Sequence, residues 1–135
     1  MGHWVSSNHN HADEYMGSCL PYVTSSIVES SANDVHKITF PYVTRWVIVH
    51  NSEAGGTSKT IKFGFTDNGV RGTETSNYFT LHSGEISPRL EVKCTEIFIG
   101  AGHDDTEYSV IAGYTNIPKN RFLNLTGSEG FQGVG

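Results

Sequence analysis

Apolar and polar residues alternate along most of the chain, from Tyr22 to about Tyr114, with the period of two that half-buried β-strands require. In "SKTIKFGFT" (58–66), Ile61, Phe63 and Phe65 fall on one face. In "RLEVKC" (89–94), every second residue from Leu90 to Cys94 is apolar. The segment "YVTRWVIVHN" (42–51) carries bulky residues on both faces, which predicts a strand that is central or covered on both sides.

Weaker alternation predicts further strands, which brings the expected total to eight. These segments are 22–29, 36–40, 77–82, 96–100 and 107–115. Turn-forming residues separate the strands, in "SSAND" (30–34), "EAGG" (53–56), "TDNG" (66–69), "HSGE" (82–85) and "AGHDD" (101–105). No stretch has apolar residues at helical spacing long enough for a helix, so the pattern excludes βαβ units and their nucleotide sites.

The strand pattern predicts an all-β fold closed either as a two-sheet sandwich or as a small barrel. The immunoglobulin type lacks its paired cysteines about Trp46, and the long polar connection "DNGVRGTETS" (67–76) suits a Greek key better than an up-and-down barrel. We therefore expect a single eight-stranded jelly-roll sandwich with flexible N- and C-terminal arms. The expected parts are a polar, His-rich arm (1–21), the jelly-roll domain (22–117) and a Gly-rich arm (118–135).

The length and net charge of the chain exclude some classes of binding partner. A chain of 135 residues is one domain and can bury a real core. The net charge of −5, with nine scattered Lys and Arg, gives no basic face for nucleic acid. No apolar run approaches the roughly 18 residues of a spanning helix, and the N-terminus lacks the regions of a signal peptide. We expect synthesis in a cytoplasm, no nucleic-acid partner and no stable membrane insertion.

Two cysteines, Cys19 and Cys94, are too few for a disulfide framework. Either both are reduced, or one bridge ties the N-terminal arm to the strands.

The stretch "HNHADEYMG" (9–17) contains candidate metal ligands, His9, His11 and Glu14. Cupin-class jelly-roll enzymes hold a metal with two histidines one residue apart, a later glutamate and a further histidine. Here the glutamate comes too early, no spaced glycine matches, and the segment precedes the strands that would orient the ligands. No serine lies in a G-x-S-x-G turn either. We expect a solvated arm, with no metal, no cofactor and no catalytic residue.

Both ends of the chain are polar and contain isolated apolar residues. Trp4 lies in the N-terminal arm, and Phe122 and Phe131 lie in the tail "PKNRFLNLTGSEGFQGVG" (118–135). Such a segment cannot fold by itself. These residues are candidate anchors that dock into neighbouring subunits; the alternative is a frayed terminus.

Several motifs together resemble a known family. They are "FPYVTRWVIVHNSEAGG", "IKFGFTDNGVRGTETSNYFTL", "LEVKCTEIFI", "YSVIAGYTNIP" and the end "LTGSEGFQGVG". Across nearly residues 38 to 135, the chain is similar to the small single jelly-roll vertex (penton) proteins of large icosahedral double-stranded DNA viruses infecting eukaryotes. The His-rich opening has no counterpart in that pattern.

The resemblance implies a structural role and no enzymatic activity. Five copies would form a homopentamer at each five-fold vertex of the virion, contacting neighbouring major and minor capsid proteins, after assembly in the host cytoplasm. A cyclic pentamer joins two different faces of one subunit, so interface residues must lie on both sides of the sandwich. The candidates at expected outward positions are Arg45, Arg71, Tyr78 and Tyr114.

Two other functions fit parts of the sequence. A carbohydrate- or receptor-binding module of a viral particle would use exposed aromatic residues such as Trp4 and Tyr15 to stack on sugars. A cupin-like metalloenzyme would use His9, His11 and Glu14.

Overall fold

Seven strands pair into two antiparallel sheets in the computed structural model, which describes residues 19–29, 34–54, 59–72, 76–102 and 105–122. The strands are β1 (Leu20–Val28), β2 (Val35–Thr39), β3 (Tyr42–Asn51), β4 (Ile61–Gly64), β5 (Phe79–Leu81), β6 (Glu96–Ala101) and β7 (Thr106–Pro118). Two short helices accompany them, α2 (Asp67–Arg71) and the 3-10 helix η1 (Lys119–Arg121). The expectation of a two-sheet β-sandwich is therefore confirmed, and the described part of the chain is mostly β rather than all-β.

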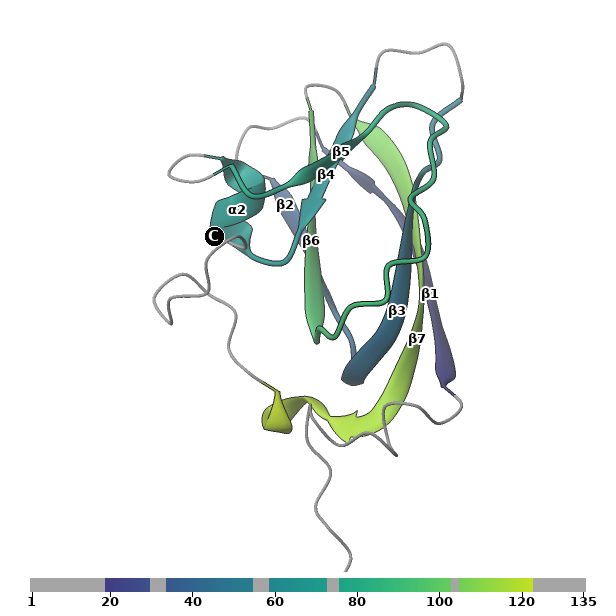
Figure 1. Ribbon diagram of the computed structural model, residues 1–135. Helices are drawn as coiled ribbons and strands as arrows, with labels where there is room; N and C mark the ends of the chain where they lie inside the picture. The colour runs from purple at the N-terminus through teal and green to yellow at the C-terminus, as the bar shows by residue number, and fades with distance from the viewer. Residues whose placement is uncertain (1–18, 30–33, 55–58, 73–75, 103–104, 123–135) are drawn as a thin grey trace, which may run out of the picture.

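The two layers face one another across the core (Figure 1). One sheet has the order β1-β7-β3 and the other has the order β2-β6-β4-β5. The chain crosses between the layers from β1 to β2, from β2 to β3, from β3 to β4 and from β6 to β7. These repeated crossings bring residues that are distant in sequence against each other in one core.

The core contains one face of each strand, as the period-two pattern requires. Val47 and Val49 point inward from β3, and Ile61 and Phe63 point inward from β4. The predicted inward face of 58–66 is therefore confirmed. The members of the buried cluster are Val28, Ile38, Phe40, Val47, Val49, Ile61, Phe63, Leu81, Cys94, Ile97, Ile99, Tyr108, Val110 and Ala112.

A β-bulge interrupts the pairing of β3 with β7. Thr44 pairs with Tyr114 while Trp46 pairs with Gly113, so two residues of β3 advance against one of β7. The bulge changes which residues point inward, because the alternation restarts on its far side. Val43 and Thr44 are consequently both fully buried, although they are neighbours in the chain.

The strand expected over 89–94 does not form, although its inward face is correct. Only an isolated bridge joins Val47 to Leu90. At Cys94 the hydroxyl of Thr44 takes the place of a backbone carbonyl, because it donates to Val92 O (2.8 Å) and accepts from Cys94 N–H (3.0 Å), while Thr44 N–H donates to Cys94 O (2.9 Å). Segment 86–94 therefore follows β3 as an irregular edge.

The exclusion of helices was wrong for one short element. Helix α2 lies in the segment expected to be a polar loop, and its signals are caps rather than apolar periodicity. The Thr66 hydroxyl accepts from Gly69 N–H (3.0 Å), and Gly72 ends the helix with φ 71°. Arg71 binds Asp67 one turn earlier (2.7 Å), which also raises the pKa of Arg71.

The buried amide of Asn51 connects the end of β3 to the other sheet. Its Nδ2 donates to Lys59 O and Leu81 O, both at 3.1 Å, and its Oδ1 accepts from Glu53 N–H (3.2 Å). The predicted turn at 82–85 closes beside it, with Gly84 at φ 79°, a value that suits glycine. This corner fixes where β5 ends.

The two cysteines are free, and the alternative of a disulfide bridge is wrong. Cys94 lies in the core, where burial raises the pKa of its thiol to about 11. A Cβ built on Gly113 would lie 2.5 Å from Cys19 Sγ and 2.6 Å from Trp46 Nε1, which places Cys19 beside Trp46 on the outer side of the β1-β7-β3 sheet.

Replacing Asn51 with Asp tests whether its side-chain amide holds the end of β3 to Lys59 and Leu81. A carboxylate has no donor for Lys59 O and Leu81 O, so the buried charge should lower the free energy of unfolding at pH 7 by about 3–5 kcal/mol. Burial raises the pKa of such a carboxyl above its ordinary value of about 3.9, so the deficit should shrink as pH falls from neutrality through the raised pKa and should level off below about 4. Asn116→Asp, at an exposed position, is the matched control in chemical denaturation. An equal loss in both variants would contradict this role.

Thiol labelling tests the placement of the cysteines. At pH 8 a thiol reagent should modify Cys19 in the folded protein and reach Cys94 only on unfolding, because Cys94 is fully buried and protonated. Since the pKa of Cys94 is raised from 9.0 to about 11, its contribution to stability is lost as pH rises through that interval. A Cys19→Ser variant assigns the fast-reacting thiol; fast modification of that variant would contradict the buried placement.

Candidate functional site

The outer face of the β1-β7-β3 sheet carries an apolar row. Val23 pairs with Ile111, and Ile111 also pairs with Ile48, so these three side chains lie side by side on one face. Val23 is 66% exposed and Ile111 is 39% exposed. Aliphatic residues at such exposure in adjacent strands form a contiguous patch rather than scattered singles.

The next rows of this face are also poor in charge. The hydroxyls of Ser25 and Ser109 bond each other at 2.8 Å, and Ile27 lies beyond Ser25 and is 51% exposed. Glu107, which pairs with Ile27, contributes a carboxylate at this end of the face. We call Val23, Ile27, Ile48, Glu107 and Ile111 the β1 surface.

Strand β1 also has an open backbone edge. Among the described strands it pairs only with β7, and its nine residues, "LPYVTSSIV", include no charged side chain. Proteins usually protect such edges with charges, bulges or very short strands. Here Pro21, near the start of β1, is the one residue of the strand that lacks an N–H.

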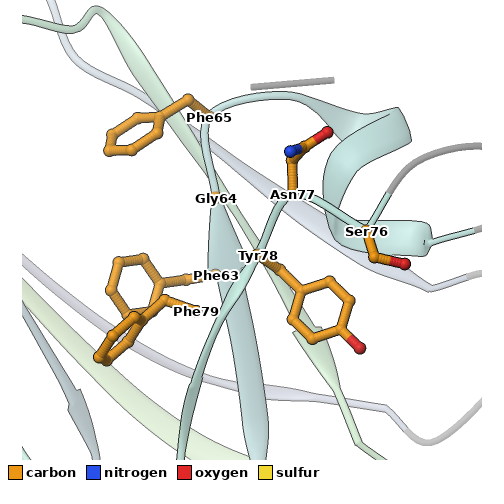
Figure 2. Close-up of a pocket in the computed structure, with 7 residues that line it drawn as sticks. All are labelled: Phe63, Gly64, Phe65, Ser76, Asn77, Tyr78 and Phe79. Atoms are coloured by element: carbon orange, nitrogen blue, oxygen red, sulfur yellow. The ribbon is translucent and has the colours of Figure 1, made fainter. Parts of the chain in front are cut away.

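A second apolar surface surrounds an open hollow of about 290 Å³ at the β4–β5 edge of the other sheet. Figure 2 shows the rings of Phe63, Phe65 and Phe79 on one side of this strand pair and Tyr78 on the other. Phe63 and Phe79 are cross-strand partners with ring centroids 5.5 Å apart. Phe63 is buried, whereas Phe79 is 57% exposed, because β5 has only three residues and leaves its first residue at the rim.

Gly64 and α2 shape the hollow. A Cβ at Gly64 would lie 2.7 Å from Asn77 O, so only glycine allows the chain before β5 to approach β4 this closely. Asn77 N–H in turn donates to Gly69 O of α2 (3.2 Å). Short helix α2 thereby positions the segment that carries Tyr78 and Phe79.

A lysine accompanies the aromatic residues at this edge. Lys62 Nζ lies 4.9 Å from the centroid of the Tyr78 ring, which is cation–π geometry. Tyr78 is 39% exposed, so the pair is accessible from outside. We call Lys62, Phe63, Phe65, Tyr78 and Phe79 the β5 surface.

Strands β1 and β5 lie at opposite lateral edges of the sandwich, and the β1 surface extends from β1 across the outer face of its sheet to Ile48 of β3. The bond from Asn51 to Leu81 O places β3 over β5. The rings of Tyr22 and Phe40 are 5.1 Å apart, which places β1 over the end of β2. Because β2 and β5 are the two edges of their sheet, β1 and β5 mark opposite sides of the molecule.

The expected interface residues divide between the two sheets. Tyr78 belongs to the β5 surface, and Arg71 is nearby in α2 but is engaged by Asp67. Arg45 lies at the bulge of β3 and Tyr114 lies in β7, where its ring stacks on Tyr42 at 5.6 Å. The structure therefore does not bring the four residues into one site.

The candidate metal ligands and most of the candidate arm anchors do not belong to either surface. His9, His11, Glu14, Trp4 and Phe131 lie outside the described residues, whereas Phe122 is half-buried after η1. No group of three or more His, Cys, Asp and Glu that could hold a metal occurs within the part of the chain that is described. Nor does that part contain a helix long and apolar enough to span a membrane.

Sequence reasoning missed the β1 surface and most of the β5 surface. In "YVTSSIVE" (22–29), Val23 and Ile27 occupy the face opposite Tyr22, a signal that the outward side of this strand is not polar. The pairing of Phe63 with Phe79 depends on a register that the sequence does not specify.

Comparison with known proteins gave no identification. No family model matches the chain, and no curated protein matches it significantly.

Alanine substitutions at the β5 surface should affect the free energy of unfolding differently at the buried Phe63 and at the exposed Phe79. Phe63→Ala should lower the free energy of unfolding by about 3–5 kcal/mol, because it leaves a cavity in the core. Phe79→Ala should cost about 1 kcal/mol or less, because most of that side chain faces solvent. Denaturant titration of both variants measures the difference; equal losses would mean that Phe79 belongs to the core.

Proposed function

We propose that this chain is a structural capsid protein, five copies of which form the capsomer at an icosahedral five-fold vertex. The observation that carries the proposal is the presence of two apolar surfaces on one small β-sandwich, one on the outer face of the β1-β7-β3 sheet and one at the β4–β5 edge of the other sheet. The resemblance of residues 38 to 135 to vertex proteins supports the same role.

Two different exposed surfaces suit a ring. A contact that joins one surface to a different surface on the next copy is heterologous, and it closes into a ring when the rotation between copies closes. A specific interface buries about 800 Å² on each partner. Strand β1 alone, with nine residues, offers an edge of about 30 Å. Apolar side chains along such an edge are the expected centre of an interface of that size.

The jelly-roll form of the sandwich is part of the proposal. Segment 86–94 follows β3 through the bridges Val47 to Leu90 and His50 to Ile86. We interpret this segment as the eighth strand in irregular form, which gives each sheet four members. The arms, including Trp4 and Phe131, would then contact the surrounding major and minor capsid proteins of the virion after assembly in the host cytoplasm.

One observation favours a second role for the same particle protein, recognition of a carbohydrate receptor. Tyr42, 37% exposed, stacks on Tyr114 with an interplanar angle of 19°, which offers an aromatic platform at the surface. Glycan-array binding by the wild type that is lost in Tyr42→Ala would support this role.

Native mass spectrometry of the purified chain tests the capsomer proposal. Five chains of 14.8 kDa each should appear as one species of about 74 kDa, because the paired apolar surfaces close a ring. Thr39→Lys, an added charge at an exposed position of β2, should keep the same mass. A wild-type protein that stays monomeric or dimeric over the whole concentration range would contradict the proposal.

A further inference from the structure

We infer that neighbouring copies join head to tail, with the β1 surface of one copy packed on the β5 surface of the next. This inference rests on the proposed function, since it names the contact that would hold the pentamer together. Each copy then uses both surfaces, one toward each neighbour.

Placement is the first argument for this contact. Strand β1, which carries Val23 and Ile27, and strand β5 lie on opposite sides of the sandwich, and the two surfaces belong to different sheets. If each surface met its own equivalent, every contact would be two-fold and the ring would not form. A contact between unlike surfaces covers both of them with a single kind of interface.

Shape and polarity are the second argument. The β5 surface is hollowed, with aromatic walls that include Phe65 and the exposed ring of Phe79. The β1 surface offers a row of β-branched side chains, among them Val23 and Ile111, that stand out from a strand face. Aliphatic side chains that enter an aromatic hollow are typical of the dry centre of an interface.

Charge is the third argument. The β5 surface has one cation, Lys62 beside Tyr78, and the β1 surface has one carboxylate, Glu107 beside Ile27. Neither side chain has an ion pair within the described residues. Opposite single charges at the rims favour the joining of unlike surfaces and oppose the joining of like ones.

Two surface variants test the contact by complementation. Val23→Lys places a charge on the β1 surface and Phe79→Lys places one on the β5 surface; both positions are more than half exposed, so folding should survive and circular dichroism checks it. Each variant alone should raise the concentration needed for half-assembly by at least about tenfold. Thr39→Lys is the matched control and should assemble as the wild type does.

A mixture of the two variants gives the decisive result. Val23→Lys keeps an intact β5 surface and Phe79→Lys keeps an intact β1 surface, so one good contact is available between unlike variants. Sedimentation and native mass spectrometry of the mixture should show one-to-one heterodimers of two 14.8 kDa chains that neither variant forms alone. The charge exchange Lys62→Glu with Glu107→Lys should restore assembly that each single reversal weakens.

Other outcomes would overturn the inference, and they distinguish failure of the proposed contact from failure of the proposed function. Pentamers that persist in either lysine variant would place the interface elsewhere and leave the capsomer proposal standing. Dimers of Phe79→Lys alone would indicate a two-fold contact through β1. A mixture without heterodimers, from variants that are each monomeric, would also reject the contact between unlike surfaces. A wild type that does not self-associate would instead remove the proposed function, and the contact with it.

Discussion

The buried amide of Asn51 is the interaction on which the β5 edge of the sandwich depends. It occupies a site without solvent, and each of its hydrogen-bonding groups has a backbone partner, at Lys59, Leu81 and Glu53. An unpaired amide in such a place costs about 1–3 kcal/mol, so these three segments are held together. Because Leu81 is the last residue of β5, the amide also fixes the side of the molecule on which the aromatic hollow lies.

The edge strands of the sandwich differ in how they are protected from pairing with another chain. Edge strand β2 has five residues and carries Lys37, which binds Glu96 at 3.1 Å. Edge strand β5 has three residues. Both follow the usual means of avoiding edge-to-edge pairing. Strand β1 is three times the length of β5 and uncharged, with aliphatic residues on its outward face. Assembly with another copy would cover that face without any change in the packing of the core.

Much of the sandwich could be predicted because alternation directly reports which side of a strand is buried. The inward positions of Ile61 and Phe63, the turn closed by Gly84 and the burial of Cys94 all follow from local sequence. Helix α2 could not be found by periodicity, since five residues make too few turns for an apolar stripe. Its caps, Thr66 and Gly72, were the available signal.

Features that depend on pairing between distant segments could not be predicted. The pairing of 89–94 with β3 is irregular where the Thr44 side chain, rather than a backbone carbonyl, accepts from Cys94 N–H, and one sequence does not reveal such a contact. Tyr78 was expected at an interface from its outward position, and it does line the hollow. Phe79 was missed as an exposed residue because its apolar character predicts burial, and only the short length of β5 leaves it at the rim.

Electron cryo-microscopy of the purified oligomer tests assembly through two unlike surfaces. We expect particles with five-fold symmetry, in which β1 of each copy lies against the β4–β5 edge of the next. Particles with two-fold symmetry, or a five-fold ring in which Val23 and Phe79 both face solvent, would contradict it.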